Sequence, residues 1–437
     1  MLYLSAGLKS DRLLEELVNY FPYAYPLPKG DTPFGVHTEL AVTPWNPHSR
    51  LLRIAIKASD LRVEALPAAN LVFLVDVSGS MDRREGLPMV QSTLKLLVEQ
   101  LRAQDRVSLV VYAGSSRVVL QPTSGSEKAK IRAAIDQLTA GGSTAGESGI
   151  QLAYQQAQQG FIEGGINRIL LATDGDFNVG ISDFDSLKQL AADKRKTGIS
   201  LTTLGFGTDN YNEQLMEQLA DAGDGNYAYI DTLREARKVL VDQLSSTLAT
   251  VASDVKIQVE FNPAQVSEYR LLGYENRALK REDFSNDKVD AGEIGAGHTV
   301  TALYEVVPVG GKGWLEPLRY QAAVKGAKQD GELAWLRIRY KTPGQGVSQL
   351  LEQPIHAVDV TTLDHASEDL RFAAAVAAFA QQLKGATYTG GFSLADSAEL
   401  ARTAKGEDRF GLRSEFVQLV ELAQSLHTSA DRERRAD

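Results

Sequence analysis

Between residues 70 and 249, short apolar runs alternate with segments whose apolar residues recur at helical spacing. The apolar runs cover residues 71–75, 107–112, 169–172, 201–206 and 227–230. The helical patterns cover residues 87–101, 128–138, 148–158, 185–194, 213–220 and 233–249. Parallel strands need a long crossover, usually a helix, so the alternation predicts an α/β doubly wound, Rossmann-like domain over residues 68–250. Residues 117–120 follow a Gly-Ser-Ser turn, which predicts an antiparallel edge strand.

Strand patterns lie on both sides of this region. Two of them, at residues 37–42 and 51–57, precede it, and others follow at residues 255–261, 269–273, 298–307 and 333–340. An isolated pair of strands is marginally stable. We therefore expect residues 36–67 and 251–360 to form one β-sandwich-like domain into which the α/β domain is inserted, the alternative being two separate small β units.

Helical patterns mark the two ends of the chain. Residues 1–35 contain a short amphipathic helix, with Ser10 as a candidate cap, followed by a Pro- and Gly-rich segment. Residues 361–427 form a C-terminal helical region with patterns at 364–383 and 395–426. The charged residues 428–437 are predicted to be a disordered tail.

Composition excludes several classes of protein. The net charge of −10 over 437 residues, without a basic stripe, argues against nucleic-acid binding. The absence of cysteine excludes thiolate catalysis and zinc–thiolate sites. The apolar runs are far shorter than the roughly 20 residues that span a bilayer, and the first residues lack the pattern of a signal peptide. We expect no transmembrane segment in this chain, and a lipid anchor would lie outside it.

Five oxygen-bearing side chains are expected to meet at one edge of the α/β sheet. The first apolar run ends on Asp76, with Ser78 and Ser80 just after it, and the run that ends on Asp174 is expected to be its neighbour. Thr144 follows a Gly-rich loop between them. Ligands of doubly wound sheets bind at the carboxyl ends of the strands, and oxygen-only donor sets suit Mg²⁺, Ca²⁺ or Mn²⁺. The set predicts a metal site whose open position binds an Asp or Glu of a partner protein.

This spacing resembles a known motif. Asp76-x-Ser78-x-Ser80, then Thr144, then Asp174-Gly175 is similar to the metal-ion-dependent adhesion site of the von Willebrand factor A domain, and the resemblance covers residues 68–250. It implies that the hydroxyls coordinate the ion directly or through water, and that the aspartates often act through water.

A narrower resemblance covers nearly the whole chain. Residues 16–21, 175–180, 273–278 and 290–299 resemble a bacterial envelope family in which a von Willebrand A domain lies between unassigned flanking regions, many members being lipoproteins. The resemblance implies a protein of the bacterial cell envelope, periplasmic or on the surface, with a membrane anchor in the full-length form.

Simpler interpretations apply to single residues. Ser78 and Ser80 are also good helix caps, Thr144 with Glu147 fits a capping box, and Asp176 is favoured as a turn residue. The glycines of residues 204–207 do not complete a dinucleotide fingerprint, and no phosphate-binding loop motif is present.

An enzyme is not expected. A phosphoryl-transfer aspartate at position 76 usually has a second Asp two residues on as general acid, and here that residue is Ser78. Two other roles stay open. One is a cytoplasmic substrate adaptor for an AAA-type ATPase, and the other is an ion that only stabilises the fold.

Overall fold

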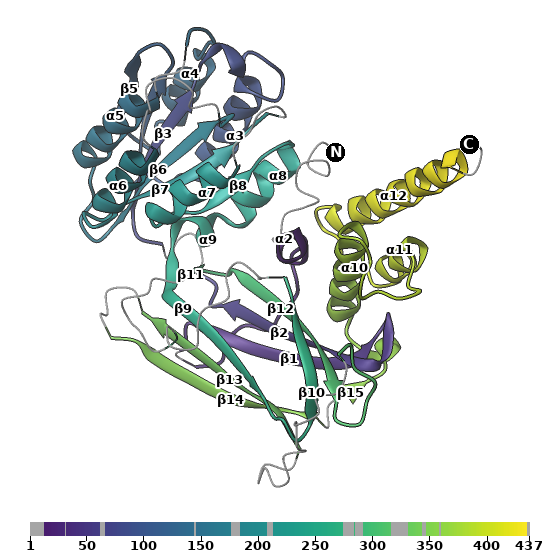
Figure 1. Cartoon of the computed structure of the whole chain (residues 1–437). Coiled ribbons are helices and arrows are strands. Elements are labelled where there is room, and N and C mark those ends of the chain that lie inside the picture. Colours follow the sequence, from purple (N-terminus) through teal and green to yellow (C-terminus); the bar gives the residue numbers. More distant parts are fainter. Residues whose placement is uncertain are drawn as a thin grey trace. The chain divides into compact units, whose positions relative to one another are not determined.

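The computed structural model describes residues 13–30, 32–61, 66–143, 146–175, 184–207, 213–273, 284, 292–315, 331–342, 347–357 and 360–434. The chain forms two compact units (Figure 1). The α/β unit consists of Asp60–Thr250 with Gly295–Gly297. The sandwich unit consists of Met1–Ser59, Val251–Ile294 and His298–Asp437. The finer six-part division expected from the sequence stays a prediction.

The α/β unit contains a sheet in the order β5-β4-β3-β6-β7-β8. Its strands are β3 (Ala69–Asp76), β4 (Arg106–Tyr112), β5 (Ser116–Ser124), β6 (Ile166–Thr173), β7 (Ile199–Gly205) and β8 (Tyr227–Tyr229). All neighbouring pairs are parallel except β4 and β5, so the predicted antiparallel edge strand is confirmed. Every residue of β3 is buried, as expected of a central strand covered on both faces.

Helices cover both faces of this sheet. They are α3 (Leu87–Gln100), α4 (Lys128–Asp136), α5 (Gly146–Gln159), α6 (Phe184–Arg195), α7 (Glu213–Ala222), α8 (Leu233–Arg237) and α9 (Leu244–Leu248). Phe73 of β3 packs with Leu94 of α3 in one core, whereas Leu74 packs with Ile150 of α5 in the other. Successive strand residues point to opposite faces, so two cores result, and the doubly wound prediction is confirmed. The single helix expected at 233–249 is instead α8, a π-helical turn at Lys238–Asp242 and α9.

The sandwich unit contains two sheets, ordered β10-β12-β2-β1-β15 and β11-β9-β13-β14. The strands are β1 (Phe34–Thr43), β2 (Asn46–Ala58), β9 (Thr250–Phe261), β10 (Val266–Leu272), β11 (Gly292–Gly295), β12 (Thr299–Pro308), β13 (Glu332–Lys341), β14 (Gln349–His356) and β15 (Val360–Thr361). β2 pairs antiparallel with β12, Leu52 opposite Tyr304, so strands before and after the α/β unit share a sheet. Ile54 and Ile338, one from each sheet, lie in a common core, and the insertion prediction is confirmed.

Among the described residues, four helices pack in a second core of the sandwich unit. They are α2 (Leu13–Tyr20), α10 (Glu368–Leu383), α11 (Leu394–Thr403) and α12 (Leu412–Arg434). Ala55 of β2 belongs to this core together with Phe372 of α10 and Phe416 of α12. The helical stretch expected at 395–426 is therefore two helices. The prediction of a disordered tail from residue 428 onward is wrong for residues 428–434, because α12 continues to Arg434.

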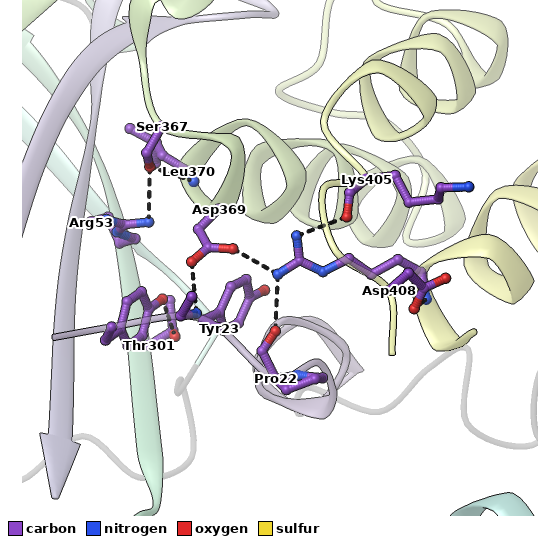
Figure 2. Close-up of polar contacts among 12 residues, drawn as sticks. Pro22, Tyr23, Arg53, Thr301, Ser367, Asp369, Leu370, Lys405 and Asp408 are labelled. Carbon is purple, nitrogen blue, oxygen red and sulfur yellow. Dashed lines mark hydrogen bonds and ion pairs between the residues drawn. The ribbon is translucent and has the colours of Figure 1, made fainter. Parts of the chain in front are cut away.

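Polar contacts around Asp369 join segments from the N-terminal and C-terminal parts of the chain inside this unit (Figure 2). Arg413 of α12 contacts a carboxylate oxygen of Asp369 at 2.6 Å and donates to the carbonyl of Pro22 at 2.9 Å. The other oxygen of Asp369 accepts the backbone N–H of Ala24 at 2.9 Å. The Arg413 guanidinium also lies over the ring of Phe372, 4.6 Å from its centroid. The segment after α2 is thus tied to α10 and α12 by a charge pair with fixed geometry.

Among the described residues, no helix combines the length and the apolarity needed to cross a bilayer.

Candidate metal centre

Asp76 and Asp174 follow neighbouring strands. β3 ends on Asp76, and Asp174 comes directly after β6. The two strands are parallel and adjacent, with Val75 opposite Ala172, so their carboxyl ends lie at the same edge of the sheet. β3 has β4 on its other side, and β6 has β7, so the order reverses between β3 and β6. This is the position where doubly wound sheets bind ligands.

Two hydrogen bonds fix the orientation of the Asp76 carboxylate, which is fully buried. The backbone N–H of Ser78 donates to one oxygen at 2.8 Å, and the Thr173 hydroxyl donates to the other at 3.1 Å. The Thr173 hydroxyl in turn accepts the backbone N–H of Gly175 at 3.0 Å. Rotation of the carboxylate would break these bonds, so its free lone pairs point in set directions.

The two serines lie side by side. The hydroxyl oxygens of Ser78 and Ser80 are 3.0 Å apart. Ser78 is extended and precedes a 3₁₀ turn at Gly79–Met81, but its side chain does not cap that turn, and the residue at the start of α3 is Gly86. The structure therefore does not show the helix capping that the sequence offers as an alternative role for these hydroxyls. The Gly79 N–H donates to the Gly142 carbonyl at 3.0 Å, which places the Gly-rich loop against this turn.

Arg83 is a residue of the site that sequence reasoning missed. Its Nε donates to the backbone carbonyl of Ser80 at 2.8 Å. One terminal guanidinium nitrogen lies 3.4 Å from a carboxylate oxygen of Asp174, whose side chain is 2% exposed. A cation three residues after the last serine was the available signal, but its contact with Asp174 depends on the strand order.

Burial makes the charge on Asp76 costly. Desolvation, with a smaller contribution from the nearby Asp174 charge, raises the pKa of this carboxyl from 3.8 to about 6, although the hydrogen bonds from Ser78 and Thr173 lower it. The Tyr112 hydroxyl beside it has a pKa well above its usual range, first because of burial and then because of the Asp76 charge. A cation at this edge would relieve the repulsion between the two carboxylates.

The donor set fits a hard divalent ion. Its carboxylates and hydroxyls are oxygen ligands of the kind that Mg²⁺ and Ca²⁺ prefer. In the part of the chain that the structure describes, no three His, Cys, Asp or Glu residues gather as a metal cluster. The described donors at this edge therefore carry few formal charges. The hydrogen bonds bring Asp76, Ser78, Ser80 and Asp174 to one edge, whereas Thr144 and Asp176 lie outside the described residues. Glu147 lies in the first turn of α5 and accepts a hydrogen bond from Gln151 at 3.2 Å.

Three family descriptions match parts of the chain. Residues 70–243 match the von Willebrand factor type A domain. Residues 246–426 match the C-terminal region of the uncharacterized protein YfbK. Residues 10–53 match a further description named von Willebrand factor.

Individual proteins match as well. The uncharacterized protein YfbK of Escherichia coli is 52% identical over 419 residues, which is 94% of this chain and 72% of that protein. The magnesium-chelatase 60 kDa subunit of Cereibacter sphaeroides is 30% identical over 207 residues, which is 44% of this chain and 37% of that subunit. The solved structure of a von Willebrand factor type A protein from Catenulispora acidiphila has a TM-score of 0.48 and 16% identity, with 90% of this chain and 91% of that chain covered.

Proposed function

The chain belongs to the family of Escherichia coli YfbK and contains a von Willebrand factor type A domain at residues 70–243, and from this premise we propose that it is a divalent-metal-dependent protein-binding module. Domains of this type are generally metal-dependent interaction modules. The observation that carries the proposal is the meeting of buried Asp76 and Asp174 at the ends of adjacent strands, beside two hydroxyls 3.0 Å apart. We propose a non-catalytic role.

Asp76, Ser78, Ser80, Thr144 and Asp174 would hold the ion, which we propose to be Mg²⁺, with Ca²⁺ or Mn²⁺ as alternatives. Bound there, the ion supplies an electrophilic position for a carboxylate of a partner protein. The chain's own residues orient the donors: Ser78 and Thr173 set the direction of Asp76. Two carboxylates neutralise a divalent ion less than three or four would, which favours an acidic Asp or Glu ligand from outside. We place the protein in the bacterial cell envelope as part of the same proposal.

Titration of Mg²⁺, Mn²⁺ and Ca²⁺ into the metal-stripped protein by calorimetry tests the site. We expect saturable binding by the wild type and its loss in Asp174→Ala, because the variant removes one of the two carboxylates. Asp82→Ala is the matched control, since Asp82 is an exposed carboxylate two residues after Ser80. Equal binding by wild type and Asp174→Ala would contradict the proposed ligand set. A lower stability of Asp174→Ala with partner binding intact would favour an ion that only stabilises the fold.

Thr173→Val tests the orientation of Asp76. Valine keeps the shape of threonine but removes the hydroxyl that donates to Asp76 at 3.1 Å. Loss of a group that orients a metal ligand typically weakens metal affinity by about 10- to 100-fold, and we expect the lower end, about tenfold. The control is Thr203→Val, which removes a buried hydroxyl from β7 that donates to the Met216 carbonyl. Equal ion affinities in the two variants would contradict a role of the Thr173 hydroxyl in orienting Asp76 for the ion.

A second candidate is an adaptor in a multi-subunit machine, such as a cytoplasmic substrate adaptor for an AAA-type ATPase. It is favoured by the 30% identity over 207 residues to a protein named as a magnesium-chelatase subunit. Cell fractionation followed by detection of the tagged protein separates the candidates. Recovery in the envelope fraction supports the first, and recovery in the cytoplasm supports the second.

A further inference from the structure

Arg83 reaches two of the residues that are proposed to hold the ion. Its Nε is anchored at 2.8 Å on the Ser80 carbonyl, and its terminal nitrogen lies 3.4 Å from the Asp174 carboxylate. The arginine side chain is 27% exposed, whereas the Asp174 side chain is 2% exposed. A fixed positive charge therefore extends from the surface to a buried carboxylate.

The position of this charge has an electrostatic cause. A buried carboxylate without a counter-charge is strongly disfavoured, and Asp174 also lies near the charge of Asp76. The guanidinium lowers this cost in the metal-free protein. The Ser80 carbonyl makes the arrangement specific, because the planar guanidinium bonds to the carbonyl and faces the carboxylate at the same time.

A divalent ion and this guanidinium have the same sign of charge and share Asp174. With both present, the ion would be repelled at short range by a cation that is partly shielded from water. With the ion absent, the guanidinium stands in for part of its charge.

We propose that Arg83 is an internal counter-cation of the metal centre, which stabilises the metal-free fold and competes with the divalent ion for Asp174. The inference rests on the proposed metal-dependent function and adds a residue that sets the ion concentration at which the module becomes active. Ion binding would then require the terminal nitrogens of the guanidinium to move away from Asp174. The Arg83 Nε would stay bonded to the Ser80 carbonyl.

The test uses the full chain and Mg²⁺ alone. Arg83→Gln removes the charge, and we expect Mg²⁺ affinity measured by calorimetry to rise by about tenfold or more. In EDTA we expect the same variant to melt at a lower temperature than the wild type, because the guanidinium 3.4 Å from the buried Asp174 carboxylate is lost. Arg84→Gln is the matched control: Arg84 is exposed, the change in net charge is identical, and neither quantity should move. Arg83→Lys keeps the charge but not the planar group that bonds to the Ser80 carbonyl, so its Mg²⁺ affinity should lie between those of the wild type and Arg83→Gln.

The outcomes separate this inference from the proposed function. Tighter binding by Arg83→Gln, or binding by that variant alone, supports the inference. Binding by the wild type with unchanged or weaker binding by Arg83→Gln overturns it and leaves the metal-dependent function standing. No binding by either protein overturns both. Equal tightening in Arg83→Gln and Arg84→Gln also overturns it, because the effect would then come from net charge alone.

Discussion

Arg413→Met is expected to lower the free energy of unfolding of the sandwich unit by about 3–5 kcal/mol, the usual cost of removing one partner from a buried ion pair. Methionine fills similar space but leaves the Asp369 carboxylate without the guanidinium that it contacts at 2.6 Å. It also removes the donor to the Pro22 carbonyl and the cation–π contact with Phe372. The Arg413 side chain is 6% exposed and that of Asp369 16%, so water replaces little of what is lost.

Tryptophan fluorescence during urea unfolding measures this effect for the sandwich unit alone. All 3 tryptophans of the chain, Trp45, Trp314 and Trp335, belong to that unit. Arg409→Met is the control, since Arg409 is an exposed arginine four residues before Arg413. Its replacement should change the free energy of unfolding by less than about 0.5 kcal/mol. If Arg413→Met were no more destabilising than Arg409→Met, the network of Figure 2 would not hold the chain ends together.

The α/β unit could be predicted in detail because its sequence signals are local and strong. Every residue of β3 is buried, its residues 71–75 form a continuous apolar run, and the abrupt end of that run on Asp76 marks the edge of the sheet. The adjacency of β3 and β6 follows from the crossover rule for doubly wound sheets, not from any single residue. The metal role of the predicted residues stays a prediction.

The strands that were missed have weak patterns. β14 (Gln349–His356) is largely exposed or half-buried along its length and contains Pro354, which is typical of an edge strand. β11 and β15 have only 4 and 2 residues. Tertiary pairing decides whether such segments become strands, so local propensity could not identify them.

The end of α12 was missed for a different reason. Residues 428–434 are rich in charge, a pattern that predicts disorder, but Glu and Arg are good helix formers and extend an existing helix at little cost. The site residues Thr173 and Arg83 were missed because their roles depend on contacts. Thr173 acts on Asp76, 97 positions earlier, and Arg83 on Asp174, 91 positions later.

Asp76→Asn is expected to abolish divalent-ion binding and, at pH 7 in EDTA, to make the protein more stable. The folded state raises the pKa of Asp76 from 3.8 to about 6, so the ionised carboxylate opposes folding. A pKa difference of about two corresponds to about 3 kcal/mol, which is the upper limit of the gain from a neutral amide. Asparagine can keep both contacts, because it accepts from the Ser78 N–H through its oxygen while the Thr173 hydroxyl turns to accept from its amide.

The difference in stability between Asp76→Asn and the wild type should depend on pH, because the pKa of Asp76 is higher in the folded state. Below pH 3.8 Asp76 is mostly protonated in both the folded and the unfolded state, so the variant and the wild type should be nearly equal in stability. As the pH rises from 3.8 to about 6, the unfolded state loses its proton first, and the wild type should lose stability relative to Asp76→Asn. Above about pH 6 the difference should be constant. Thermal unfolding from pH 3.5 to 8 in EDTA measures it, with the exposed Asp82→Asn as control. A variant that is less stable than the wild type at pH 7 without metal would contradict the electrostatic account, whereas one that still binds Mg²⁺ would remove Asp76 from the ligand set.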